Sequence, residues 1–168
     1  MVDRPVARLE LDPESRCTPC GLLAAPHPQP RQCVARTDAF SVAHSFNTSL
    51  EGWLVVLPRR HVVRVADLDD AEARELGPLL CAVSAALAAV VGCEKTYVIQ
   101  LAEAPGFNHV HFHVVPRRAD LPEELTGVRV FGMLGDGVEP VPEPRQDAIC
   151  LEVRKLLVAG GVASAPRA

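Results

Sequence analysis

Hydrophobic positions three and four residues apart predict one long helix in the middle of the chain. Candidate N-cap residues lie at Asp67–Asp70, and Gly92 suits the C-cap because a helix often ends in a left-handed turn. Pro78 lacks a backbone N–H, so we expect it in an early turn or at a kink. The apolar positions form one face of the helix: Leu76, Leu79, Leu80, Val83, Ala86, Leu87, Val90 and Val91.

Short apolar runs predict the strands, which are Val34–Val42, Trp53–Leu57, Thr96–Gln100 and His109–Val115. The run Trp53–Leu57 is apolar throughout, as in a strand that is covered on both faces. Gln146–Val158 predicts a second helix, whereas Leu125–Leu134 is ambiguous. This order of elements favours an α+β fold with a mostly antiparallel sheet.

The length of 168 residues fits a single domain spanning 1–168, and we expect flexible ends at 1–16 and 160–168. A net charge of −4 argues against a nucleic-acid polymer as partner, although a small nucleotide is compatible with it. The first 16 residues carry charges and no apolar run, and the apolar stretch Leu79–Val91 is shorter than a bilayer requires. We therefore expect a cytoplasmic protein with no membrane partner.

Three histidines alternate with apolar residues near residue 110. Side chains two apart in a strand share a face, so His109, His111 and His113 are predicted on one face and their apolar neighbours on the other. A histidine-rich exposed strand without chemistry is one explanation, and half of the six histidines falling here argues against it. A catalytic zinc site and an imidazole nucleophile that attacks phosphorus are the others.

Two cysteines near the N-terminus have the spacing of metal ligands. Cys17-Thr-Pro-Cys20 can reach one metal ion from a tight turn, and the same spacing also occurs in redox pairs. No thioredoxin-like βαβ pattern follows it, which makes a redox pair the weaker interpretation. A metal site needs two further ligands.

The segment His109-Val-His111-Phe-His113-Val-Val115 resembles the motif of the histidine-triad (HIT) family at every position. Leu54-Val-Val-Leu-Pro-Arg-Arg-His61 resembles the upstream signature of that family, and the order of elements over 34–118 is similar. The resemblance covers roughly two-thirds of the chain. It implies a HIT-like fold with a long helix and a C-terminal helix.

The resemblance also implies an activity. His111 would attack the α-phosphorus of a nucleotide ester, anhydride or phosphoramidate and form a covalent nucleotidyl-histidine, while His113 would contact the phosphate and help proton transfer. The protein would be a nucleotide hydrolase or nucleotidyl transferase with a small-molecule nucleotide as its partner. The alternative is a non-catalytic nucleotide-binding protein that keeps the fold. Family members commonly form homodimers, so we expect one here.

Zinc-bearing relatives imply a ligand set. In them, two cysteines, the histidine after the basic pair and the first histidine of the triad bind zinc; these positions are Cys17, Cys20, His61 and His109 here. Four ligands close the site, as in structural zinc centres. The alternative is that both histidines only make hydrogen bonds, as in zinc-free relatives.

The expected substrate contacts depart from the family pattern. Ser45 stands where many members have the ribose-binding Asp or Asn, and Asn47 is a possible substitute if the segment is extended. In the shorter loop before the triad, Gly106 allows close approach to a phosphate and Asn108 is a possible donor; Gln100 is a candidate to face the site. Trp53 replaces a histidine of the family, which suggests a lost polar contact.

Overall fold

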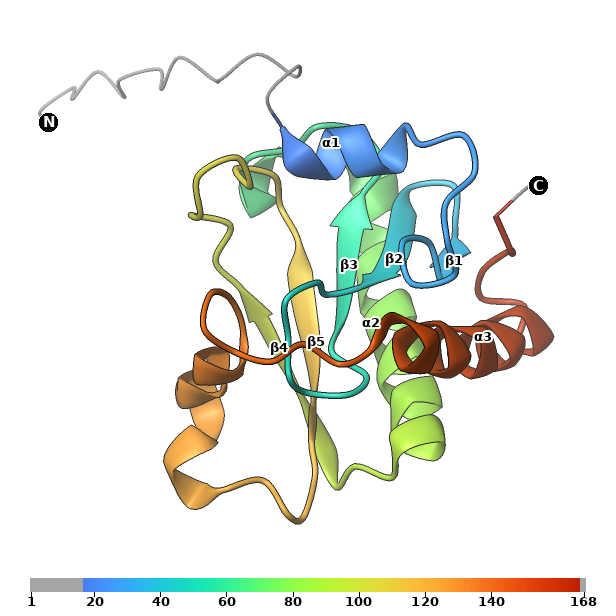
Figure 1. Cartoon of the computed structure of the whole chain (residues 1–168). Helices are drawn as coiled ribbons and strands as arrows, with labels where there is room; N and C mark the ends of the chain where they lie inside the picture. The colour runs from blue at the N-terminus through green and yellow to red at the C-terminus, as the bar shows by residue number, and fades with distance from the viewer. Residues whose placement is uncertain (1–16, 167–168) are drawn as a thin grey trace, which may run out of the picture.

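A five-stranded sheet in the order β1-β2-β3-β5-β4 organises the chain (Figure 1). The computed structural model describes residues 17–166. The strands are β1 (Ala35–Arg36), β2 (Phe40–His44), β3 (Leu54–Pro58), β4 (Lys95–Gln100) and β5 (Phe112–Arg117). All neighbouring strands are antiparallel, which confirms the predicted α+β class and antiparallel sheet.

The helices lie around this sheet and are α1 (Thr18–Leu23), α2 (Asp70–Val91) and α3 (Glu143–Ala159), with 3-10 segments η2 (Val65–Asp67), η3 (Glu123–Leu125) and η4 (Gly127–Met133). The long helix and the C-terminal helix confirm the two helices predicted from the sequence. The caps of α2 are also as expected, with Asp69 at the N-cap and Gly92 in the left-handed region at the C-cap.

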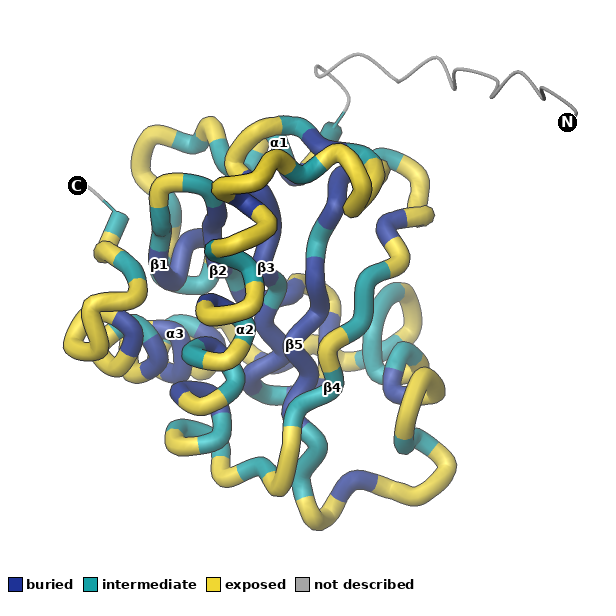
Figure 2. Tube along the Cα trace, turned by 180° about the vertical axis from the view of Figure 1, so that it is seen from behind, coloured by how far each residue is buried: buried dark blue, intermediate teal, exposed yellow. Residues whose placement is uncertain are grey.

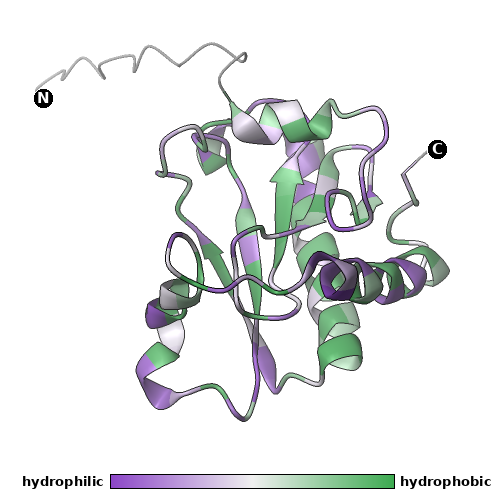
Figure 3. Cartoon of the chain, viewed as in Figure 1, coloured by the Kyte–Doolittle hydropathy of each residue, from purple (hydrophilic) through white to green (hydrophobic). Residues whose placement is uncertain are grey.

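The two faces of the sheet have different covers. On one face α2 and α3 bury the main core together with strand residues such as Phe40, Leu54 and Val114, and Figure 3 shows the apolar strands and helices that meet there. On the other face η4 packs a smaller cluster onto the sheet around Trp53, Val115 and Val130. His113 of β5 has the same parity as Val115 and therefore projects on this second face.

The N-terminus of α2 holds the chain after β3 in place. Asp69 accepts hydrogen bonds from the backbone N–H groups of Ala71 and Glu72, and the Glu72 carboxylate accepts one from the N–H of Asp69. Arg60 donates to both oxygens of the buried Glu72 carboxylate at 2.7 and 2.6 Å. This pairing anchors the residue next to His61.

The strands predicted at Trp53–Leu57 and Thr96–Gln100 differ from β3 and β4 by one residue at one or both ends, and the other two predicted strands differ more. The run Val34–Val42 is broken into β1 and β2 because Thr37 forms a turn, accepting from the Phe40 N–H at its side-chain oxygen. The strand predicted at His109–Val115 begins only at Phe112, since the N–H of Val110 donates to Val62 rather than to β3. It continues through Pro116, which is tolerated there because the pairing with β3 ends at Val114.

The apolar stretch expected to be too short for a membrane belongs to a longer helix. Among the described residues α2 is the one helix long and apolar enough to cross a membrane by length and composition. It packs on β5 and α3 through Leu79, Val83 and Leu87, and Figure 2 shows its other side open to solvent. Leu79–Val91 is the apolar part of this predicted helix, and the more polar residues Asp70–Pro78 form its N-terminal part.

The chain after α3 is hydrogen-bonded to the sheet. Ser164 pairs with Arg36 of β1 through two backbone bonds of 2.9 and 2.7 Å. These bonds lie within the end that was expected to be flexible at 160–168, and residues 1–16 and 167–168 lie outside the described residues.

Candidate functional site

Four potential metal ligands converge at one end of the sheet. One ligand atom from each of Cys17, Cys20, His61 and His109 lies within 4.8 Å of all the others. Their sources are the start of α1, the chain after β3 and the chain before β5; Figure 1 shows α1 lying across that end. The hydrogen bond from Val110 N–H to the Val62 carbonyl joins the two histidine segments side by side.

The spacing of these atoms fits a tetrahedral ion. Nδ1 of His109 lies 3.5 Å from both cysteine sulfurs, and Nδ1 of His61 lies 3.3 Å from the Cys20 sulfur. Tetrahedral zinc with ordinary bond lengths would place sulfur and nitrogen ligands about 3.6 Å apart. The Nε2 of His109 lies 3.0 Å from the Pro58 carbonyl, and a proton there leaves Nδ1 free for a metal.

His111 is held by the backbone of the first histidine. Its Nδ1 lies 2.7 Å from the carbonyl oxygen of His109, and a carbonyl can only accept, so Nδ1 carries the proton. A ring whose single proton is on Nδ1 has its lone pair on Nε2. His111 is half-buried, and Nε2 has no hydrogen-bond partner within the described part of the chain. This is the protonation pattern that a nitrogen nucleophile needs.

His113 lies deeper, in a surround formed by the aromatic rings of Trp53 and Phe131. Its side chain faces away from the main core, as do its cross-strand partners Val55 and Ile99, and only 6% of it is exposed. The Phe131 ring of η4 packs edge-on against it at 5.1 Å, and the His111 ring lies at 4.8 Å. Burial, with a smaller contribution from His111, lowers the pKa of His113 to about 4. His113 is therefore neutral near pH 7.

The sequence suggested that a polar contact is lost where Trp53 replaces a histidine. In the structure, the tryptophan itself makes a polar contact. Its indole Nε1–H donates to Nδ1 of His113 at 3.0 Å, and the two rings meet edge-on. The preceding residue, Gly52, has φ of +80°, and a Cβ at residue 52 would lie only 2.9 Å from side-chain atoms of Leu87 and Val91. A glycine is therefore needed for the backbone to place Trp53 here. The signal for this contact was in the sequence, since a buried tryptophan N–H usually has an acceptor.

Ser45 and Asn47 follow β2 in a loop rather than an extended segment. Ser45 is buried, and its backbone N–H donates to the Trp53 carbonyl at 2.8 Å, so it lies next to the aromatic surround. Asn47 is exposed with φ of +52°, and its carbonyl accepts from Gly135. The backbone turns at Asn47, so the segment is not extended and the condition under which these two side chains would share a face is not met.

Of the three other expected substrate contacts, Gln100 lies on β4, and Gly106 and Asn108 lie in the loop before β5. Gln100 pairs with Phe112, so its side chain projects on the face opposite His113, contrary to expectation. Gly106 has φ of +78°, and its carbonyl accepts from the N–H of Thr18, which joins this loop to α1. Asn108 is exposed in the same loop. The neighbouring Phe107 ring packs on Phe46 at 5.5 Å, a contact that sequence periodicity did not predict.

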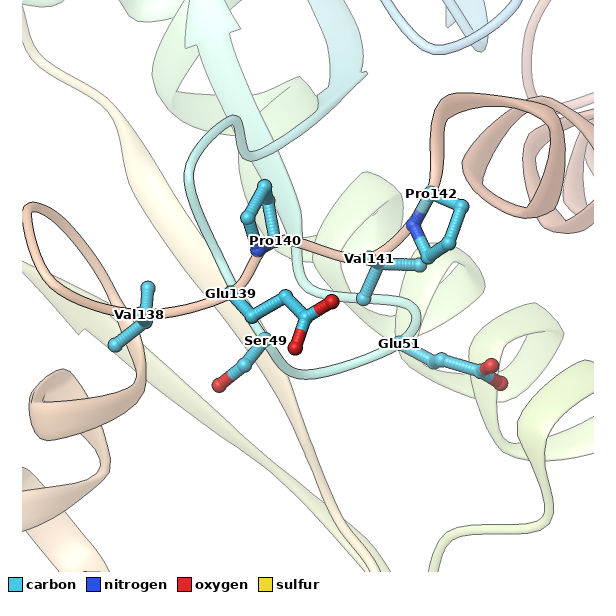
Figure 4. Close-up of a pocket in the computed structure, with 7 residues that line it drawn as sticks. All are labelled: Ser49, Glu51, Val138, Glu139, Pro140, Val141 and Pro142. Carbon is cyan, nitrogen blue, oxygen red and sulfur yellow. The ribbon is translucent and has the colours of Figure 1, made fainter.

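A surface hollow lies apart from these residues. It is lined by Ser49, Glu51 and the connection 138–142 (Figure 4). None of the predicted site residues lines it, so the histidine segment, rather than this hollow, is the candidate site.

Comparison with known proteins agrees with this fold. The model of the HIT domain matches residues 27–120. A Zn-bound histidine triad family protein from Mycobacterium smegmatis is 16% identical with a TM-score of 0.61, over 86% of this chain and 95% of that one. A hypothetical histidine triad nucleotide-binding protein from Sulfolobus tokodaii is 16% identical with a TM-score of 0.65, over 85% and 93%.

A Hit-like protein involved in cell-cycle regulation from Bartonella henselae is likewise similar, with 17% identity and a TM-score of 0.62 over 81% of this chain and 92% of that one. At such identities these structures support the fold alone. No curated protein matches the sequence.

Proposed function

Because the chain belongs to the HIT domain family, whose members are generally nucleotide hydrolases or transferases, we propose that it acts at the α-phosphorus of a nucleotide through a covalent nucleotidyl-His111. The observation that carries the proposal is the bond from His111 Nδ1–H to the His109 carbonyl, which leaves Nε2 with a lone pair. The neighbouring neutral His113 supports it as a hydrogen-bonding partner for the phosphate.

The proposed reaction has two displacements at phosphorus. First, the Nε2 lone pair of His111 forms a bond to the α-phosphorus, and the bond to the leaving group breaks with its electron pair on that group. Second, water or another acceptor attacks the phosphorus, and the P–N electron pair returns to Nε2. With water, the product is a nucleoside monophosphate and a proton passes to solvent. Throughout, the His109 carbonyl holds the proton on Nδ1 of His111.

We propose that the four-ligand cluster holds a structural zinc ion. The two thiols and two imidazoles are the donor set zinc prefers, and their spacing supports four-coordination. Such an ion cross-links α1, the chain after β3 and the triad segment. Since the carbonyl of His109 accepts from His111, fixing the His109 ring would also position the nucleophile.

The alternative is a binding protein without turnover, and two placements favour it. Gln100 projects away from the histidine face, and Asn47 is turned out of an extended conformation. If this alternative holds, the chain binds a nucleotide without forming an adduct.

Trapping the adduct tests the proposal. Wild-type protein mixed with a dinucleoside tetraphosphate and quenched in alkali, which preserves P–N bonds, is expected to gain the mass of one nucleotidyl group. His111→Ala should gain none, while His27→Ala, which removes an exposed loop histidine, should behave as wild type. An adduct on His111→Ala would refute the assigned nucleophile, and nucleotide binding without adduct or turnover would favour the alternative.

We also propose that two copies pair through the β4 edge of the sheet. β4 has a neighbour on one side only, and Val98 and Leu101 at this edge are 47% and 55% exposed. An unpaired edge with exposed apolar side chains is suited to strand pairing with a second copy.

Replacing Val98 by lysine is expected to convert the dimer to a monomer in sedimentation, because the charge would be buried at the joint edge. Leu151→Lys changes a comparably exposed residue on α3 and should leave the dimer intact. A monomeric wild type, or a dimer that survives Val98→Lys but not Leu151→Lys, would refute this interface.

A further inference from the structure

The contact between Trp53 and His113 restricts where the proton on His113 can lie. An indole N–H donates and cannot accept, so Nδ1 of His113 must present a lone pair to it at 3.0 Å. The proton of the neutral ring then lies on Nε2. A second proton on Nδ1 would place two N–H groups against each other in a buried position.

Nothing else around His113 opposes this state. Trp53 and Phe131 enclose the ring edge-on and carry no charge, and His111 is the one titratable group in contact with it among the described residues. Nε2 of His113 has no hydrogen-bond partner within residues 17–166, so its N–H is available to a ligand. The pKa of His113 is lowered to about 4, which likewise favours the neutral ring.

We propose that Trp53 is a positioning residue that keeps His113 as a neutral Nε2–H hydrogen-bond donor, and that the site therefore prefers nucleotides whose leaving group departs without a proton. The proposal rests on the proposed function. The preferred substrates are nucleotide anhydrides, in which a nucleoside 5′-phosphate is joined to a carboxylate or to a further phosphate.

The reason lies in what each leaving group needs. When His111 attacks a carboxylic–phosphoric anhydride, the P–O bond breaks and a carboxylate leaves with the electron pair, so no proton has to move. An alkylamine must take up a proton as the P–N bond breaks. Neutral imidazole N–H is a very weak acid, and the Nδ1–H of His111 is held by the His109 carbonyl. Neither histidine therefore supplies that proton.

The state of His113 can be measured without any substrate. In wild-type protein at pH 7, the imidazole ¹⁵N signals of His113 are expected to show an unprotonated Nδ1 and a protonated Nε2. In Trp53→Phe, which keeps an aromatic ring and removes the donor, we expect a mixture of the two tautomers. Phe131→Leu is the matched control, because it loosens the same surround and keeps the indole N–H.

The leaving-group preference is measured as kcat/KM on acetyl adenylate, a dinucleoside tetraphosphate and an adenosine 5′-phosphoramidate of an alkylamine. Wild type is expected to cleave the acetyl adenylate about 100-fold or more faster than the amidate, since general acid catalysis typically contributes at least that much. Trp53→Phe should lower the ratio of the two kcat/KM values. Phe131→Leu should change both kcat/KM values by the same factor and leave the ratio unchanged.

A protonated Nδ1 on His113 in wild type overturns the inference, as does cleavage of the amidate at the rate of the anhydrides. An unchanged ratio in a folded Trp53→Phe also overturns the role of Trp53. Failure to release nucleotide from any of the three substrates refutes the proposed function and with it the substrate preference. The ¹⁵N measurement needs no substrate, so it tests the tautomer of His113 independently of activity.

Discussion

Replacing His111 by alanine is expected to lower kcat/KM for nucleotide release by about 10³-fold or more, because removing a covalent nucleophile leaves only binding and charge stabilisation. The fold should tolerate the change, since the half-buried side chain makes one hydrogen bond to backbone, which is worth about 1 kcal/mol. Steady-state kinetics with thermal unfolding measured on the same sample separates the two effects.

A second substitution at this position tests the chemistry more closely. His111→Gly leaves space for free imidazole, and added imidazole should restore part of the nucleotide release. The same addition should do nothing for wild type or for His27→Ala. Retention of most of the activity in His111→Ala, with a normal unfolding transition, would show that another group attacks the phosphorus.

Loss of the metal cluster is expected to have the largest effect on stability. We expect Cys20→Ser to remove bound zinc and to lower the free energy of unfolding by about 3 kcal/mol or more, since binding energy at a structural site is folding energy. The effect is large because the cluster joins α1 to two chain segments that meet through the bond from Val110 N–H to the Val62 carbonyl. Metal analysis and thermal unfolding measure the two results.

The matched control is Cys81→Ser, which changes an exposed cysteine on α2 and should alter neither zinc content nor unfolding. Chelation distinguishes a structural from a catalytic ion. A structural ion predicts that activity and fold are lost together, whereas instant loss of activity in a protein that stays folded would favour a catalytic one. Full zinc occupancy and unchanged unfolding in Cys20→Ser would refute the ligand set.

The parts of the fold that follow from periodicity were predictable. The apolar face of α2 and its capping residues are local properties, and Asp69 and Gly92 occupy the caps as expected. The alternation around the triad also predicted which side chains face the core, because Val110 and Phe112 are buried there. The spacing of Cys17 and Cys20 indicated a chelating pair, and the resemblance to zinc-bearing relatives added His61 and His109; the fold brings the ligand atoms of all four within 4.8 Å of one another.

Contacts between segments that lack a periodic pattern were not predictable. The segment 125–134 had no clear helix or strand pattern, yet as η3 and η4 it places Phe131 against both Trp53 and His113. Strand register decided the side-chain direction of Gln100, and register depends on pairing with a distant strand. A left-handed residue at Asn47 likewise has no strong signal in its neighbours.

The metal cluster also bears on the order in which the chain can assemble during synthesis. Cys17 and His109 lie 92 positions apart, so the site cannot close until the triad segment has left the ribosome. Until then the Cys17–Cys20 pair is a two-thiol chelator without its histidine partners, open to other metal ions and to oxidants. With zinc in the cluster as proposed, the positioning of His111 depends on the metal supply and thiol chemistry around the nascent chain, before any substrate binds.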